Sequence, residues 1–159
     1  MLTWIFFCVG AGRKPDTKGP AQVTNALKAG AVYFAVVFAA GFVLGFLRVF
    51  VVVPRIGALR AVALELPIML AVSWTVCGWV LRRYAVPVAC GARAAMGLIA
   101  FVLLMLAELA LAIATGRTFA AFMASLAMPE GVLGLSGQAI FAMLPLIRRR
   151  ATNRYNPDP

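Results

Sequence analysis

Hydrophobic residues in this chain gather in four long stretches, at residues 29–53, 61–81, 94–114 and 131–147. The first three each have the roughly 20 residues that an α-helix needs to cross the hydrocarbon core of a bilayer. The fourth has only about 17, which is the short end of the range that can still cross. The pattern predicts an all-α integral membrane bundle of four transmembrane helices, with one transmembrane domain over residues 29–147.

A weaker helical pattern lies between the third and fourth stretches, in residues 115–128. Phe119, Phe122, Met123 and Leu126 recur there at the spacing of one helix face. We therefore expect a short amphipathic helix before the fourth span, lying at the interface or within an extracytoplasmic loop.

The two ends of the chain have a different composition from the spans. Residues 1–28 are predicted to form an N-terminal cytoplasmic arm, and residues 148–159 a basic cytoplasmic tail. Residues 1–9 are apolar but too short to cross a bilayer, and no basic residues precede them. They are interpreted as either an interfacial anchor or an over-long start of the reading frame.

Composition supports a membrane protein over a soluble one. Hydrophobic residues make up 64% of the chain and charged residues 13%, against about half and a quarter in soluble domains. The net charge is +10, but the Lys and Arg residues lie in short clusters between apolar stretches. A nucleic-acid-binding domain would gather them on one soluble face. Nucleic acid is therefore excluded as a partner, and the lipid bilayer is expected.

The basic clusters also predict the orientation. With four spans, eleven basic residues fall on one side and three on the other. Since cytoplasmic loops carry the excess of Lys and Arg, both termini are predicted to be cytoplasmic. Residue usage typical of a high-GC bacterial gene then favours a multi-pass protein of the bacterial inner membrane. The tail should also attract anionic lipids at the cytoplasmic face. The eleven are Arg13, Lys14, Lys18, Lys28, Arg82, Arg83, Arg93, Arg148, Arg149, Arg150 and Arg154, and the three are Arg55, Arg60 and Arg117.

Three charged residues, Arg48, Glu65 and Glu108, lie inside predicted spans. A charge deep in a bilayer costs at least a few kcal/mol on insertion scales, so such residues usually face protein or water. Their distances from the span ends place all three in the extracytoplasmic half of the membrane, where we predict an intramembrane polar cluster. It is either an ion pair that fixes the packing, or a site open to the outside in which a Glu titrates or Arg48 binds an anion.

Small residues share the faces of these charges. Gly41 and Gly45 form a GxxxG motif, and Arg48 follows Gly41 by seven residues, which is nearly two helical turns. Gly97 precedes Glu108 by eleven residues, again close to whole turns. Because small residues let helices approach closely, Gly41, Gly45 and Gly97 are predicted to pack helices together.

Little in the sequence indicates an enzyme. The chain contains no histidine, which removes the commonest general base and the commonest zinc ligand. Its three cysteines, Cys8, Cys77 and Cys90, lack metal or redox spacing. We therefore expect no catalytic residue, no metal and no cofactor.

Three motifs carry a resemblance that covers most of residues 30–147. They are GFVLGFLRVFVVVPRIG at 41–57, LELPIML at 64–70 and MLAELALAI at 105–113. The chain resembles a group of uncharacterised small four-span proteins of proteobacteria. The resemblance implies four-span topology and no particular activity.

Two functions stay open from the sequence. The first is a non-enzymatic structural or accessory membrane protein whose bundle is fixed by Arg48, Glu65 and Glu108. The alternative is a small oligomeric proton-coupled transporter or channel that uses the same three residues. A homo-oligomer remains open in both.

Overall fold

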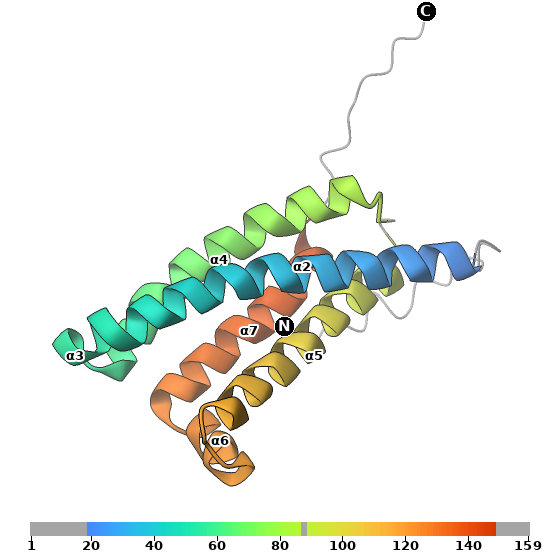
Figure 1. The fold of residues 1–159 in the computed structure, drawn as a ribbon. Helices are drawn as coiled ribbons and strands as arrows, with labels where there is room; N and C mark the ends of the chain where they lie inside the picture. The colour runs from blue at the N-terminus through green and yellow to red at the C-terminus, as the bar shows by residue number, and fades with distance from the viewer. Residues whose placement is uncertain (1–18, 87–88, 149–159) are drawn as a thin grey trace, which may run out of the picture.

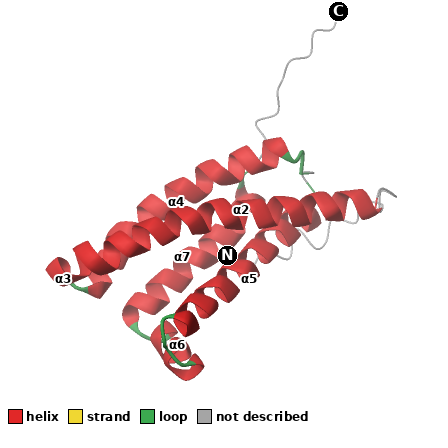
Figure 2. Cartoon of the chain, in the orientation of Figure 1, coloured by secondary structure: helices red, strands yellow, loops and turns green. Residues whose placement is uncertain are grey.

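The computed structural model describes residues 19–86 and 89–148, and within them every regular element is helical (Figure 2). Four helices are long and apolar enough to cross a membrane: Thr24–Ile56, Ala58–Arg83, Cys90–Ala114 and Pro129–Ile147. The predicted all-α class is confirmed, and the length and composition of these four helices fit a multi-pass membrane protein. The elements are α2 (Gly19–Leu47), the π-helical η1 (Arg48–Val52), α3 (Val53–Ile56), α4 (Ala58–Arg83), α5 (Cys90–Ala114), α6 (Phe119–Leu126) and α7 (Pro129–Ile147).

The four long helices form one bundle. α2 packs against α4 and α5, and α7 packs against the same two helices from the other side (Figure 1). The start of α2, the link from α4 to α5 and the end of α7 meet at one end, called here the terminal end. The turn at Gly57 and the short helix α6 lie at the opposite end, called the hairpin end (Figure 1).

The helices extend beyond the predicted spans, most of all at the start of the first one. Residues 19–28 form the start of α2, although the sequence analysis placed them in the N-terminal arm, outside the first span. Pro20 is the second residue of α2, where its missing N–H would have no intrahelical partner in any case. The rest of the predicted arm (1–18) and most of the predicted tail (149–159) lie outside the described residues.

The first span also runs past its predicted end at residue 53, through Pro54 to Ile56. Only Gly57 ends it, at a φ of 82° that favours glycine. Pro54 has no N–H, and its ring crowds the carbonyl of Phe50 four residues earlier. The helix adjusts by widening into η1, where the N–H of Val53 donates to the carbonyl of Arg48 five residues earlier.

The hydrophobic core occupies the terminal half of the bundle. Tyr33 of α2, Cys77 and Val80 of α4, and Met96 of α5 are fully buried there. They belong to one contiguous cluster to which all four long helices contribute. Its buried members are Ala29, Tyr33, Val37, Cys77, Val80, Leu81, Val86, Met96, Ala100, Leu104, Phe141 and Leu144.

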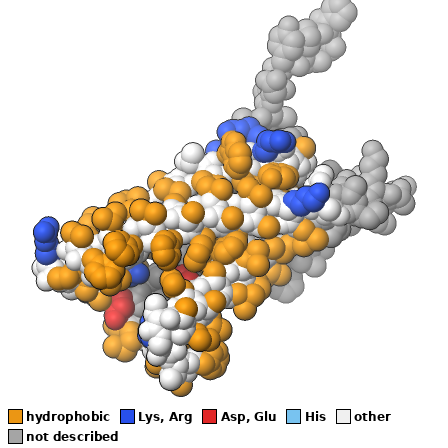
Figure 3. All heavy atoms as spheres, viewed as in Figure 1, with side chains coloured by type: hydrophobic (Ala, Val, Ile, Leu, Met, Phe, Trp, Pro, Cys, Tyr) orange, Lys and Arg blue, Asp and Glu red, His pale blue; other side chains and the backbone are white. Residues whose placement is uncertain are grey.

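The hairpin half is more open. The end that carries α3 diverges from the end that carries α6 (Figure 1). The space-filling view shows a hollow between them, with basic and acidic side chains visible inside it (Figure 3). Seven large apolar side chains between positions 42 and 51 of the first span are exposed: Phe42, Val43, Phe46, Leu47, Val49, Phe50 and Val51.

Candidate functional site

The first two spans each place a charged side chain at the same distance from the hairpin end. Arg48 begins η1, nine residues before Gly57, and Glu65 lies in α4, eight residues after it. At 1.5 Å of rise per residue, both lie about 12–14 Å along the helix from that turn.

The last two spans repeat this spacing. Glu108 of α5 lies eight residues before Gly116, which follows that helix, and Gln138 of α7 lies nine residues after Pro129, which begins it. Each span therefore contributes one polar side chain at one level. The set of Arg48, Glu65, Glu108 and Gln138 is called here the polar layer.

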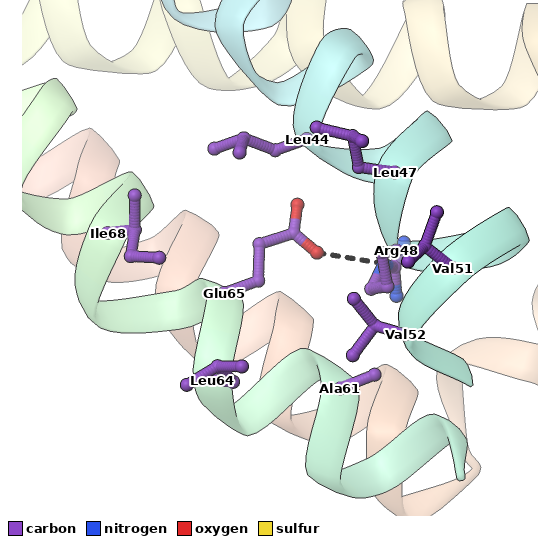
Figure 4. A pocket seen from close by; sticks show the side chains of 9 residues that line it. All are labelled: Leu44, Leu47, Arg48, Val51, Val52, Ala61, Leu64, Glu65 and Ile68. Carbon is purple, nitrogen blue, oxygen red and sulfur yellow. Dashed lines mark ion pairs between the residues drawn. The ribbon is translucent and has the colours of Figure 1, made fainter. Parts of the chain in front are cut away.

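Arg48 and Glu65 form an ion pair between η1 of the first span and α4. Nε of Arg48 lies 2.8 Å from Oε2 of Glu65 (Figure 4). The same Nε is buried, and in the described part of the chain it has no hydrogen-bond partner, so its N–H is not aligned with the carboxylate. Charge attraction therefore holds the pair, and the hydrogen-bonding capacity of the guanidinium is largely unused.

Glu108 and Gln138 form the other half of the layer. Nε2 of Gln138 donates a hydrogen bond of 2.5 Å to Oε1 of Glu108, which joins α5 to α7. Oε1 of Gln138 is buried and finds no donor among the described residues. Of the three predicted cluster residues, the structure therefore brings Arg48 and Glu65 together, whereas Glu108 pairs with Gln138.

A pocket of about 270 Å³ opens beside the ion pair, between the end of the first span and α4 (Figure 4). Apart from Arg48 and Glu65, its lining is apolar, so it can take up an apolar chain or side chain beside a single charged pair. The apolar lining residues are Leu44, Leu47, Val51, Val52, Ala61, Leu64 and Ile68.

A buried arginine that the sequence misplaced lies at the terminal end. Arg93 is counted above as a loop charge, because the predicted third span starts at Ala94. It instead lies inside α5 and is only 3% exposed. Its Nη1 donates to the carbonyls of Pro145, at 3.3 Å, and of Arg148. These carbonyls are among the last of α7 and have no acceptor role within the helix, so Arg93 caps α7 and complements its dipole.

Arg148 ties the end of α7 to α4. Its Nη1 donates to the carbonyl of Trp74, and its guanidinium lies 4.7 Å from the centre of the Trp74 ring. The guanidinium also lies against Gly78, where a Cβ atom would collide with it. A residue predicted to signal orientation therefore also holds two helices together.

A third contact at this end follows from a proline. Pro145 lacks the N–H that would bond to the carbonyl of Phe141 four residues earlier. The hydroxyl of Tyr33 in α2 donates to that carbonyl at 3.2 Å, and the rings of Tyr33 and Phe141 stack with centres 4.4 Å apart. The carbonyl of Phe141, which Pro145 leaves without a partner in the helix, thus accepts a hydrogen bond that joins α2 to α7.

The three predicted packing glycines behave differently. A Cβ on Gly97 would collide with the carbonyl oxygen of Ala142, so α5 and α7 approach closely there. A Cβ on Gly41 would meet the end of the Met69 side chain at 3.2 Å. A Cβ on Gly45 would meet nothing within 4 Å among the described residues. Within one chain, half of the GxxxG motif is therefore unused.

Comparisons with protein-family models, curated proteins and solved structures found no match for this chain. Its function is therefore argued from the polar layer and from the way the four spans hold it.

Gln138 is the member of the layer that sequence reasoning missed. The sequence places Gln138 on one face of the fourth span with Gly131 and Gly134 but does not connect it to Glu108. The signal that would have found it is depth, because a spacing of eight or nine residues from a turn recurs in all four spans. Chemically, the layer offers one cation, two carboxyl groups and one amide, which suits charge pairing, proton exchange or anion binding.

Proposed function

We propose that this chain is a non-enzymatic multi-pass membrane protein with a structural or accessory role, and that its polar layer sets the packing of the spans. One observation carries the proposal: the polar contacts run between helices at a single level. Arg48 and Glu65 join the first span to α4 at 2.8 Å, and Gln138 and Glu108 join α5 to α7 at 2.5 Å.

The physical reason is the cost of polar groups in hydrocarbon. Lipid tails offer no hydrogen-bond partner, so a polar side chain at this depth is most stable against a partner on a neighbouring helix. When only apolar side chains meet, two helices can slide or rotate relative to each other at little cost in free energy. One polar contact on each helix pair favours a single depth and a single rotation.

The proposal includes the placement of the chain. It puts both termini in the cytoplasm of a bacterium and the chain in the inner membrane, because ten basic residues against three remain on that side once the buried Arg93 is left out. It also includes membership of the group of proteobacterial four-span proteins that the three motifs resemble. A C-terminal reporter enzyme that is active only in the periplasm should stay silent. Periplasmic activity would overturn this placement.

The structural role is tested by removing the charges singly and together. Arg48→Leu leaves Glu65 without its cation, and breaking such a pair costs about 3–5 kcal/mol where it is shielded from water. We expect a sharp loss of abundance and of thermal stability in detergent. The double variant Arg48→Leu/Glu65→Leu should recover much of the loss, because no charge is stranded. Arg60→Leu, at an exposed arginine near the hairpin end, is the matched control and should change little.

A small oligomeric proton-coupled transporter is the second candidate, and Glu108 favours it. In the described part of the chain Glu108 has no basic residue within ion-pair distance and bonds only to an amide. Purified protein in liposomes with a trapped pH-sensitive dye would test this candidate. Proton flux that is lost in Glu108→Gln while abundance stays normal would favour transport over a structural role. Absence of flux in the unsubstituted protein would count against transport.

A further inference from the structure

We infer that two copies of this chain pack side by side through the hairpin half of the first span, so that Arg48 of each copy meets Glu65 of the other. The inference goes beyond the proposed function, since it names the surface and the partner. It combines three features of that half of the span: its exposure, the unused donors of Arg48 and the depth of Glu65.

The first feature is a helix that lacks neighbours. The seven exposed apolar side chains between positions 42 and 51 cover more than half of the helix circumference, at about 100° per residue. Phe46 and Phe50 stand among them with ring centres 4.5 Å apart. Nothing lies within 4 Å of a Cβ placed on Gly45, so a second helix can approach the backbone closely at that point.

Lipid tails can cover the apolar side chains but cannot serve Arg48. The side chain of Arg48 is 34% exposed, and no hydrogen bond from it is formed within residues 19–86 and 89–148. A guanidinium carries five N–H donors in a planar fork that suits carboxylates. Hydrocarbon supplies no acceptor at this depth. Arg48 lies at the edge of this apolar surface, beside the pocket, so a partner that covers the surface can bring Arg48 an acceptor.

A second copy supplies that acceptor at the right height. Two copies inserted with the same orientation and related by a two-fold axis along the membrane normal keep every residue at its own depth. Arg48 and Glu65 lie nine and eight residues from the same turn. Glu65 of one copy therefore stands level with Arg48 of the other, and its side chain is 18% exposed beside the same pocket. The surface is self-complementary in charge, which favours a second copy over an unrelated partner.

The decisive experiment co-expresses two variants with opposite charge reversals, Arg48→Glu and Glu65→Arg, on differently tagged chains. Alone, each variant carries like charges at positions 48 and 65, so we expect low abundance and few dimers. Together, each reversed position faces an opposite charge on the other chain. The two tags should then co-purify from mild detergent, and the abundance of both chains should rise several-fold.

The same experiment separates this inference from the structural role of the ion pair. If the pair acts only within one chain, the double variant Arg48→Glu/Glu65→Arg in a single chain restores abundance, but co-expression of the two single variants restores nothing. That result would overturn the inference and leave the proposed function standing.

A second measurement uses Gly45, where a single chain has room for a larger side chain. Gly45→Leu should leave the folded monomer intact, because the site is open, but should lower the dimer fraction by about tenfold as bulk enters a close helix contact. Gly134→Leu is the matched control, since a Cβ on this α7 glycine also meets nothing within 4 Å. The dimer fraction can be counted by single-molecule photobleaching in nanodiscs. An equal dimer fraction in both variants, or only monomers in the unsubstituted protein, would contradict the inference.

Discussion

The two halves of the bundle are held together by different means. In the terminal half, apolar side chains from all four long helices pack into one core, and three polar side chains bond to backbone carbonyls across helix interfaces. In the hairpin half the first span diverges, and the polar layer adds an ion pair and a hydrogen bond to the apolar contacts between helices. The terminal half therefore has the larger apolar core, and the hairpin half has the polar contacts between side chains. Substitutions that change one of the two should affect the halves unequally.

Within the terminal half, the largest effect is expected where backbone meets backbone. Gly97→Leu would push a side chain into the carbonyl of Ala142, and because a backbone cannot rotate away, α5 and α7 must separate. Over-packing of this kind typically costs about 1–3 kcal/mol, and we expect the upper end. Thermal unfolding in detergent measures the loss, with Gly134→Leu as the control. Equal stability of the two variants would show that the terminal half is not closely packed.

Arg93→Leu should have the next largest effect. It removes the donor to the carbonyls of Pro145 and Arg148, and hydrogen bonds from charged groups contribute about 1.5–3 kcal/mol. The loss should appear in thermal unfolding and as faster amide exchange in the last turn of α7. Arg93→Lys, which keeps the charge but loses the fork, should recover part of the stability. A stable Arg93→Leu variant would contradict the capping role.

The bond between α2 and α7 predicts a smaller effect that depends on a second residue. Tyr33→Phe should cost about 0.5–1.5 kcal/mol, the usual contribution of a neutral hydrogen bond. In a Pro145→Ala background the helix regains an N–H for the carbonyl of Phe141, so the same change should cost much less. A double-mutant cycle on unfolding free energies tests this coupling. Identical costs in the two backgrounds would show that Pro145 does not create the acceptor.

The smallest effect is expected at the open end. Gly45→Ala should be neutral for the monomer or stabilise it by up to about 1 kcal/mol, because alanine is the better helix former and nothing blocks its methyl group. The measurement is unfolding in dilute detergent, where chains are separate. A clear loss would mean that the hairpin half is closed, and that the contrast between the halves is weaker than described.

The sequence predicts the fold well where hydropathy alone decides. A run of apolar residues long enough to cross a bilayer has few stable alternatives to a helix, so the four spans and the all-α class could be predicted directly. Boundaries were less accurate, as in residues 19–28. A membrane helix can continue into water, and composition does not show where it stops.

The contacts of the site depend on how the helices lean, which local pattern does not encode. The spacing of Gly41 and Gly45 predicts one packing face, but α2 diverges from its neighbours between them, so only Gly41 meets another helix. Arg93 looks like a loop residue until the end of α7 is placed beside it. The distance of Arg48, Glu65 and Glu108 from the ends of their helices can be counted from the sequence, because the rise per residue is fixed.

The wide turn η1 has a consequence for how this gene can change length. A turn closed between Arg48 and Val53 contains one residue more than an ordinary α-helical turn. Deletion of a single codon within positions 49–51 would therefore convert that turn into an ordinary α-helical turn. The side chains on both sides of the turn would keep pointing in the same directions. A deletion in α5 would instead rotate everything beyond it by about 100°. Among natural variants of the chain, length differences inside a span should fall in this turn first.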